Sequence, residues 1–325
     1  MGFNDIKFPK ETKFLVTGGA GFIGSNLVES LINRGCFVRV LDNFSTGSIK
    51  NIEEFINNDN FELIEGDIRN LDTCQLACSD IQYVLHQAAW GSVPRSIKMP
   101  IEYEEVNIKG TLNMMVAARD NNVKRFIYAS SSSVYGDEAS LPKVEGKEGN
   151  LLSPYAITKK TNELYAKNFF DLYNLETIGL RYFNVFGKKQ NPHSYYSAVI
   201  PKFIGLLLDD KAVTINGDGE NSRDFTYIEN VIEANLKACI ADKKACGKVY
   251  NIGYGGRVTI NELYKKISSL LDKSIEPIYG EPIKGDIKHS NADISKAKSL
   301  LKYSPIYSFE DGINLTIEWY KENLK

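Results

Sequence analysis

The residues Phe14-Leu-Val-Thr17 run directly into Gly18-Gly-Ala-Gly21-Phe-Ile-Gly24, and this stretch decides the fold. Its first part is apolar and ends on a β-branched pair, which is typical of a buried strand. The residues from Phe22 to about Asn33 are amphipathic and predict a helix. A strand that turns through glycines into a helix is the opening unit of a parallel α/β sheet.

The same alternation continues through the first half of the chain. Further strands are expected at Phe37–Asp42, Phe61–Asp67, Tyr83–Ala89, Arg125–Ser130 and Thr177–Phe183, and long helices at about 101–122 and Pro154–Tyr173. Such alternation requires crossover connections, which produce a parallel sheet with helices on both faces. We therefore predict a Rossmann-type, doubly wound α/β fold.

Past about residue 185 the alternation of strands and helices becomes less regular, with loops such as Asn216-Gly-Asp-Gly219. Lys248–Gly253 still has the pattern of a strand that could join the first sheet. We expect a nucleotide-binding domain made of residues 1–185 plus about 225–259. The remaining segments, about 186–224 and 260–325, are expected to form a smaller α/β domain that binds the substrate.

The overall composition is that of an ordinary globular protein. Of the 325 residues, 43% are hydrophobic and 25% charged, and the net charge of −2 produces no field that favours nucleic acid or anionic membranes. No apolar run approaches the roughly 18–20 residues of a membrane span, and Met1–Ile6 lacks the apolar region of a signal peptide. We expect a cytoplasmic protein that binds neither nucleic acid nor membranes.

The cysteines and histidines show no metal-ligand spacing. Cys74 and Cys78 are one helical turn apart, which more often indicates a shared helix face than a metal site. His86 lies at a strand end, where a packed histidine is the simplest interpretation. The sequence therefore predicts a reduced protein without a metal.

The glycine loop predicts a dinucleotide site. Gly18, Gly21 and Gly24 allow the backbone to approach a pyrophosphate, and the following helix offers free N–H groups and the positive end of its dipole. Asp42 closes the next strand, where a carboxylate accepts hydrogen bonds from both ribose hydroxyls and repels the 2′-phosphate of NADP. NAD is thus the predicted cofactor, and the alternative is a tight glycine turn without a ligand.

Tyr155 and Lys159 form the predicted catalytic pair. A spacing of four places both on one face of a helix that begins after Ser153. An ammonium group and the positive nicotinamide ring both stabilise a phenolate, which needs about 4 kcal/mol to ionise at neutral pH. The alternative is a surface lysine that lies beside a tyrosine.

Ser130-Ser-Ser-Ser133 ends the fifth predicted strand, where a parallel sheet presents its site residues. A hydroxyl there can relay a proton between a sugar oxygen and Tyr155, although one or two of the four serines are expected only to form the turn. A hydride acceptor combined with a phenolate base oxidises a secondary alcohol.

The glycine loop, the serine cluster and the Tyr-Lys pair occur in the order typical of the extended short-chain dehydrogenase/reductase superfamily, which the chain resembles over nearly its whole length. The resemblance implies that Ser131, assisted by Ser132, acts with Tyr155 and Lys159 in catalysis. It also implies cofactor contacts from Gly18, Gly21, Phe22, Ile23, Gly24, Asp42, Asn43, Ser45, Thr46, Gly47, Asp67, Ile68, Gln87, Ala88, Ala89, Tyr155, Lys159, Tyr182 and Val185.

The residues beside Ser131 favour epimerisation within this family. Its 4,6-dehydratases carry an acid pair where this chain has Ser132 and Ser133, and its decarboxylases carry an acidic residue in the same stretch. Epimerisation at C4 needs neither group. Tyr155 takes the hydroxyl proton through Ser131, and the 4-keto sugar turns before hydride returns.

The second half of the chain resembles the UDP-sugar-binding region of the UDP-glucose 4-epimerase family. Within this family it is most similar to the UDP-N-acetylglucosamine 4-epimerases and their uronic-acid relatives. Ser290 stands where enzymes restricted to unacetylated sugars have a bulky tyrosine, so it leaves room for a 2-acetamido group. Ile283 replaces an arginine of the subgroup, with Lys284 beside it. Substrate contacts are expected from Gly91, Ser92, Ser131, Ser132, Tyr155, Asn184, Ala198, Val199, Lys202, Asn216, Arg223, Asp286 and Ser290.

We therefore expect the following activity and assembly, with one rival hypothesis of another class. The protein interconverts UDP-GlcNAc and UDP-GalNAc, with the corresponding uronic acids or UDP-glucuronate as the alternative substrates. A catalytically silent dinucleotide-sensing module is the rival of another class. The protein forms a homodimer through the helices at about 101–122 and 154–173, whose outer faces pair into a four-helix bundle.

Overall fold

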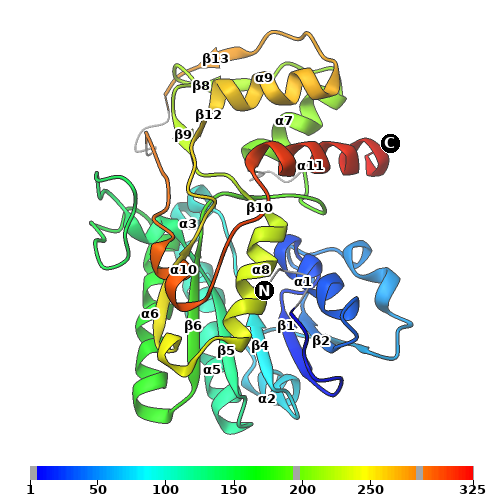
Figure 1. The fold of residues 1–325 in the computed structure, drawn as a ribbon, viewed down its shortest axis with the longest axis vertical. Helices are drawn as coiled ribbons and strands as arrows, with labels where there is room; N and C mark the ends of the chain where they lie inside the picture. Colours follow the sequence, from blue (N-terminus) through cyan, green and yellow to red (C-terminus); the bar gives the residue numbers. More distant parts are fainter. Residues whose placement is uncertain (1–5, 193–197, 283–287, 325) are drawn as a thin grey trace.

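The computed structural model describes residues 6–192, 198–282 and 288–324. Seven parallel strands form its central sheet in the order β11-β6-β5-β4-β1-β2-β3, as Figure 1 shows. Their bounds are β1 Lys13–Thr17, β2 Phe37–Asp42, β3 Phe61–Glu65, β4 Tyr83–His86, β5 Arg125–Ser131, β6 Glu176–Tyr182 and β11 Lys248–Ile252. The predicted doubly wound fold is confirmed. The strand order reverses between β1 and β4, which is where such sheets open a crevice for a ligand.

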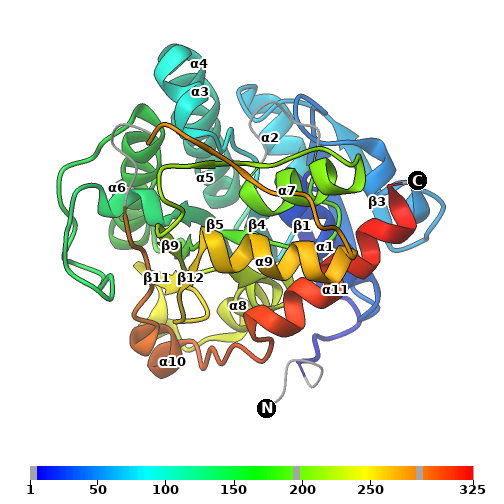
Figure 2. The same cartoon turned by 90° about the horizontal axis from the view of Figure 1, so that it is seen from above.

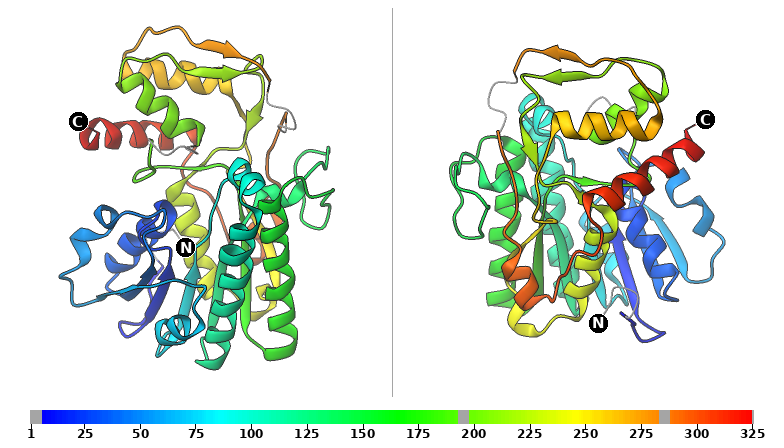
Figure 3. Two further views of the ribbon diagram at one scale, coloured as in Figure 1. Left: turned by 180° about the vertical axis from the view of Figure 1, so that it is seen from behind. Right: turned by 45° about the horizontal axis from the view of Figure 1, so that its top comes forward.

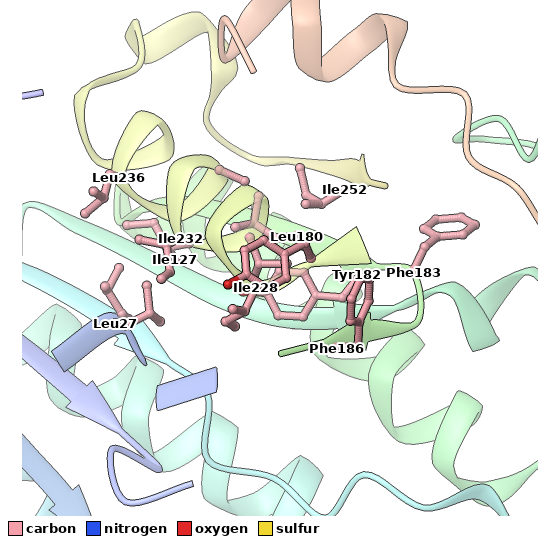
Figure 4. Packing of buried hydrophobic residues seen from close by; sticks show 14 of the residues in the cluster. Leu27, Ile127, Leu180, Tyr182, Phe183, Phe186, Ile228, Ile232, Leu236 and Ile252 are labelled. Carbon is pink, nitrogen blue, oxygen red and sulfur yellow. The ribbon is translucent and has the colours of Figure 1, made fainter. Parts of the chain in front are cut away.

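Helices cover both faces of this sheet. The helices α1 (Phe22–Ile32) and α8 (Ile228–Ile240) pack on one face, and α2 (Leu71–Cys78), α5 (Gly110–Asp120) and α6 (Pro154–Tyr173) pack on the other, as Figure 3 shows from behind. The sequence prediction did not include α8. Its residues Ile228, Ile232 and Leu236 recur every four positions and lie beside Ile127 and Leu180 of the sheet (Figure 4), so burial of this stripe anchors the helix.

The long helix expected at about 101–122 has an internal irregularity. It consists of α4 (Pro100–Tyr103), a π-helical segment η4 (Glu104–Lys109) and α5. Segments of this kind are rare and often occur at functional sites. The residue that directly follows the π-helical segment is Gly110. A glycine fits there because a Cβ would lie 2.5 Å from the Ile68 side chain.

A smaller lobe lies beyond the carboxyl ends of the strands, at the top of Figure 1 and facing the viewer in Figure 2. Its helices are α7 (Val199–Leu208), α9 (Ile260–Leu271) and α11 (Phe309–Asn323). Three short strand pairs accompany them: β7 (Val185–Phe186) with β10 (Thr226–Tyr227), β9 (Ser222–Arg223) with β12 (Val258–Thr259), and β8 (Thr214–Asn216) with β13 (Ile278–Gly280). Two shorter helices, α3 (Val93–Lys98) and α10 (Ser295–Leu300), complete the fold. In the described part of the chain, no helix has the length and apolar character to cross a bilayer.

Candidate active site

A cavity of about 540 Å³, called the main cavity below, opens at the carboxyl ends of the central strands. Its volume is typical of a site for a small molecule or cofactor. Most of the predicted cofactor and catalytic residues line it, together with two of the predicted substrate residues that have no other assigned role. These are Gly18, Gly21, Phe22, Ile23, Gly24, Asp42, Asn43, Ser45, Thr46, Asp67, Ile68, Gln87, Ala88, Ala89, Gly91, Ser131, Ser132, Tyr155, Lys159, Tyr182, Asn184 and Val185.

Gly47, a predicted cofactor contact, and Ser92, a predicted substrate contact, do not line this cavity although their chain neighbours do. Gly47 packs so tightly on Ala20 that a Cβ would lie 2.9 Å from its carbonyl carbon. Ser92 is the N-cap of α3, where its hydroxyl accepts a hydrogen bond from the Arg95 N–H at 3.2 Å. Both residues therefore shape loops at the edge of the cavity.

The glycine loop has the geometry of an anion cradle. Gly18 has a φ of +67°, which favours glycine, and a Cβ on Gly24 would lie 2.0 Å from the Gly18 carbonyl oxygen. No side chain caps the N-terminus of α1, so its first N–H groups remain available to a ligand. A pyrophosphate fits these features.

Two carboxylates line the main cavity away from the catalytic residues. Asp42 accepts hydrogen bonds from the Ala20 N–H at 2.9 Å and the Phe44 N–H at 2.8 Å, while burial raises its pKa. The hydrogen bond from Arg69 is the main reason that the pKa of Asp67 falls to about 2. Asp42 is thus held in place as an acceptor for ribose hydroxyls, as NAD requires and a 2′-phosphate would oppose.

Ser131 and Tyr155 line the same part of the site, and both face the main cavity. Ser131 ends β5, and its hydroxyl also accepts a hydrogen bond from the Ser133 N–H at 3.1 Å. Tyr155 lies in the first turn of α6, which Ser153 caps through the Ala156 N–H at 3.2 Å. Burial raises the pKa of Tyr155, and its interaction with the Ser131 hydroxyl opposes this shift. The proton relay between the two residues stays a prediction.

Lys159 does not contact the Tyr155 hydroxyl in this structure. Its Nζ donates to the Ala129 carbonyl oxygen at 2.8 Å and lies 5.9 Å from the centre of the Tyr155 ring. Burial lowers the pKa of Lys159 to about 8. The protein alone therefore does not produce the expected fall in the pKa of Tyr155, because desolvation of the phenol outweighs its interaction with Ser131. The positive charge of a bound nicotinamide ring would act in the direction that favours the phenolate.

A buried ion cluster supports these catalytic residues. Arg181 donates from Nε and Nη2 to the two carboxylate oxygens of Glu163, at 2.8 and 2.7 Å, and its Nη1 lies 2.6 Å from Glu148. Ser130 donates to Glu163 at 2.6 Å. Arg181 therefore has a structural role in joining α6 to β6.

His86 is a packed histidine, as the sequence predicted. Its Nδ1 lies 2.7 Å from the Thr17 hydroxyl, and its Nε2 lies 3.0 Å from the Thr111 hydroxyl. Burial lowers its pKa to about 3. Cys74 and Cys78 share the buried face of α2. Across the described residues, no three His, Cys, Asp or Glu side chains come together as a metal-binding group.

Most of the remaining predicted substrate residues lie apart from the main cavity. A second cavity of about 250 Å³, called the smaller cavity below, is lined by Val199, Lys202, Asn216 and Arg223, and Ala198 immediately precedes α7. The Arg223 guanidinium donates to the Ser222 and Lys288 carbonyls at 3.0 and 3.3 Å.

Ser290 is buried and donates its N–H to the Ser222 carbonyl at 3.0 Å, and it lines neither cavity. Asp286 lies outside the described residues, as do Ile283 and Lys284. The room that a small side chain at 290 leaves for an acetamido group therefore stays a prediction.

Sequence reasoning missed several residues of the main cavity, notably Trp90, Val93, Val106 and Gln190. Trp90 directly follows the loop Gln87–Ala89, so an aromatic side chain at that place was an available signal. Gln190 had no such signal, because its position depends on the path of the loop after β7.

A Ser–Tyr–Lys set at the end of a Rossmann sheet, facing a cavity with a glycine cradle, defines a protein that uses a dinucleotide to oxidise and reduce an alcohol. The chain belongs to the NAD dependent epimerase/dehydratase family, whose model matches residues 14–253. Its cofactor is NAD.

Similar proteins cover almost the full length of the chain. A UDP-glucuronate 4-epimerase of Thermodesulfobacterium geofontis is 35% identical over 96% of this chain and 97% of its own. A UDP-N-acetylglucosamine 4-epimerase structure from Methanobrevibacter ruminantium M1, in complex with UDP-N-acetylmuramic acid, has a TM-score of 0.92 and 39% identity over 97% of this chain and 100% of its own. A Bacillus cereus UDP-glucuronic acid 4-epimerase structure with UDP-glucuronic acid and NAD has a TM-score of 0.89 and 34% identity over 96% and 100%.

Proposed function

We propose that this protein epimerises a UDP-hexose at C4 through a 4-keto intermediate, and that UDP-GlcNAc and UDP-GalNAc are its substrate pair. The meeting of Ser131, Tyr155 and Lys159 in one cavity with the glycine loop and Asp42 carries the proposal, because it brings a base and a hydroxyl relay to a dinucleotide cradle. The named relatives that act on UDP-sugars at C4 support the same reaction.

The chain's own residues handle the proton and the substrate. Ser131 passes the C4 hydroxyl proton to Tyr155, and the same two residues return a proton after the sugar has turned. Bound NAD would supply the hydride acceptor and donor for C4, and the glycine loop and Asp42 would hold it. Arg223 and Lys202 border the smaller cavity, where we place the nucleotide of the substrate.

The charges around the main cavity favour a neutral hexose. Among the described residues, the charged side chains that line it are Asp42, Asp67 and Lys159. Asp42 bonds to the glycine loop and Asp67 to Asn43 and Arg69. A uronate carboxylate would therefore find Lys159 as its cation, and Lys159 already donates to the Ala129 carbonyl. This favours UDP-GlcNAc over the uronic acids, which remain the second candidate.

Parallel turnover assays test the proposal. The purified holoenzyme is incubated separately with UDP-glucose, UDP-GlcNAc, UDP-glucuronate and UDP-GlcNAc uronic acid, and each product is identified by NMR. We expect UDP-GalNAc to form fastest. A higher kcat/KM for either uronic acid would transfer the assignment to that sugar, and no C4 epimer from any of them would favour a silent dinucleotide-binding module.

We also propose a cytoplasmic homodimer with the domain division at 1–185 plus 225–259 against 186–224 plus 260–325. Ile157, Leu164 and Leu172 form an exposed apolar stripe on α6, and Ile101 on α4 is 71% exposed. Such a stripe suits pairing with a second copy. Light scattering should give twice the monomer mass for the unaltered protein, and the monomer mass for the variant Leu164→Lys.

A further inference from the structure

The indole of Trp90 is fixed from two sides at the wall of the main cavity. It lines this cavity together with Ser131 and Tyr155. The Arg95 guanidinium carbon lies 3.5 Å from the centre of its ring, and the Tyr103 ring meets it in a T-shaped arrangement at 5.6 Å. Contacts of both kinds favour one orientation of an aromatic ring.

The backbone of Trp90 is held as firmly as its side chain. The buried Asn107, in the π-helical segment, accepts a hydrogen bond from the Trp90 N–H at 2.9 Å and donates to its carbonyl oxygen at 3.0 Å. The Asn107 amide also donates to the Thr158 hydroxyl at 3.1 Å, which lies in the same helix as Tyr155. The loop that carries the indole is therefore tied to the helix that carries the base.

Tyr103 completes this connection. It is fully buried, and its ring packs in a T-shaped arrangement against Tyr155 at 6.3 Å as well as against Trp90. Its hydroxyl donates to the Ser92 carbonyl oxygen at 2.7 Å and accepts from the Ser92 N–H at 3.0 Å. Trp90 and Tyr155 thus pack on one immobile residue, which sets their relative position.

We propose that the hexose ring of the UDP-sugar packs on the Trp90 indole during epimerisation, and we call Trp90 the platform. This proposal depends on the function proposed above. A sugar ring has apolar C–H faces, and an aromatic ring packs on such a face by dispersion and burial of apolar surface. Such contacts are non-directional. They can hold the ring before and after the 4-keto sugar turns, whereas hydrogen bonds to the hydroxyl groups would favour one orientation.

The platform also has a role in keeping water from the reaction. Trp90 forms part of the wall of the cavity that Ser131 and Tyr155 also line, and displacement of water strengthens the electrostatic interactions of a site. The hydrogen bonds of Trp90 to Asn107 involve only its backbone, so we assign its side chain to binding and positioning the sugar, not to transferring the proton.

Fluorescence tests this directly because the chain contains two tryptophans, Trp90 and Trp319. Trp319 lies in α11 and packs on Tyr320. The variant Trp319→Phe leaves Trp90 as the sole indole of the NAD-loaded enzyme. It is titrated with UDP and with a UDP-4-deoxy-4-fluoro-N-acetylhexosamine, which has no C4 hydroxyl to oxidise.

We expect the fluorinated UDP-sugar to change the Trp90 emission at least twofold more than UDP does. The matched variant Trp90→Phe, which retains Trp319, should show no change specific to the sugar. Equal changes of Trp90 emission with UDP and with the UDP-sugar would contradict the proposed role of Trp90. If the analogue fails to bind at all, by calorimetry on the same sample, the proposed function fails instead.

Kinetics provide a second readout. Trp90→Ala should raise KM for the preferred UDP-hexose about tenfold, with a smaller change in kcat and no change in the inhibition constant of UDP. Trp90→Phe, which keeps an aromatic ring, should recover most of this loss and keeps the test valid if the alanine variant does not fold. If Trp90→Ala weakened the binding of UDP and of the UDP-hexose equally, the loop would have collapsed, and this result would contradict the proposal.

Discussion

Glu163 and Arg181 form two parallel hydrogen bonds, from Nε to Oε1 at 2.8 Å and from Nη2 to Oε2 at 2.7 Å. Both side chains are almost fully buried. Glu163 follows Lys159 by one turn of α6, and Arg181 lies in β6. The pair therefore joins the catalytic helix to the sheet directly beneath the site, and the Glu163 charge opposes the fall that burial causes in the pKa of Lys159.

Replacement of Glu163 by glutamine should affect both stability and the pH profile. Loss of one partner of a buried ion pair costs about 3–5 kcal/mol of unfolding free energy, measured by urea denaturation. The pKa of Lys159 should fall further, so the alkaline limb of kcat/KM moves to lower pH. As a control, Asp171→Asn removes the exposed pair with Lys167 and should cost less than about 1 kcal/mol. An unchanged alkaline limb would contradict the role assigned to Glu163.

Tyr155→Phe should lower kcat by a factor of about 10²–10⁴, because it removes the hydroxyl that exchanges a proton with Ser131. The amount of bound NAD should stay close to that of the unaltered protein, as measured by absorbance after gel filtration. Tyr165→Phe, on a more exposed part of the same helix, is the matched control and should retain full activity. Retention of more than a tenth of kcat in Tyr155→Phe would exclude a phenolate base.

The Glu148 carboxylate should contribute to stability only above acid pH. Although burial acts in the other direction, the charge of Arg181 lowers the pKa of Glu148 from 4.5 to about 2. A depressed folded-state pKa adds stability above the unfolded value, and this stability is lost as pH falls from about 4.5 towards 2. The contribution is about 3 kcal/mol at pH 7.

The variant Glu148→Gln tests this dependence. The gap in unfolding free energy between the two proteins should be widest at pH 7 and should close mostly by pH 3. Glu310→Gln, which removes an exposed pair with Lys266, should give a small gap at both pH values. A gap of equal size at pH 7 and pH 3 for Glu148→Gln would show that the ion pair is not its cause.

Gly24→Ala should remove bound NAD. A Cβ at this position would lie 2.0 Å from the Gly18 carbonyl oxygen, so the turn must open and the cradle is lost. The ratio of absorbance at 260 and 280 nm after gel filtration measures the retained cofactor. Gly35→Asn is the control, because Gly35 has a φ of +72°, which asparagine tolerates, and open space around it. If Gly24→Ala retained all of its NAD, the glycine loop would not be the pyrophosphate-binding site.

Several features of the fold and site followed from local sequence patterns. The strand pattern predicted the six sheet strands of the first half of the chain and Lys248–Gly253 as the seventh, and Pro154–Tyr173 coincides with α6. The spacing of four between Tyr155 and Lys159 placed both on one helix face. These predictions succeed because periodicity and glycine turns act over a few residues, where backbone geometry decides the outcome.

Only the tertiary structure decided which side chains meet. The contact of Trp90 with Tyr103, the pairing of Arg181 with Glu163 and the separation of Arg223 from the main cavity join or divide residues from different elements. The rise in the pKa of Tyr155 has the same origin, because burial exists only once the chain has folded. The sequence by itself determined the sheet, the glycine cradle and the catalytic residue types, since these depend on local conformation and composition. Distances and desolvation arise from packing between distant segments, and for these no local pattern carries information.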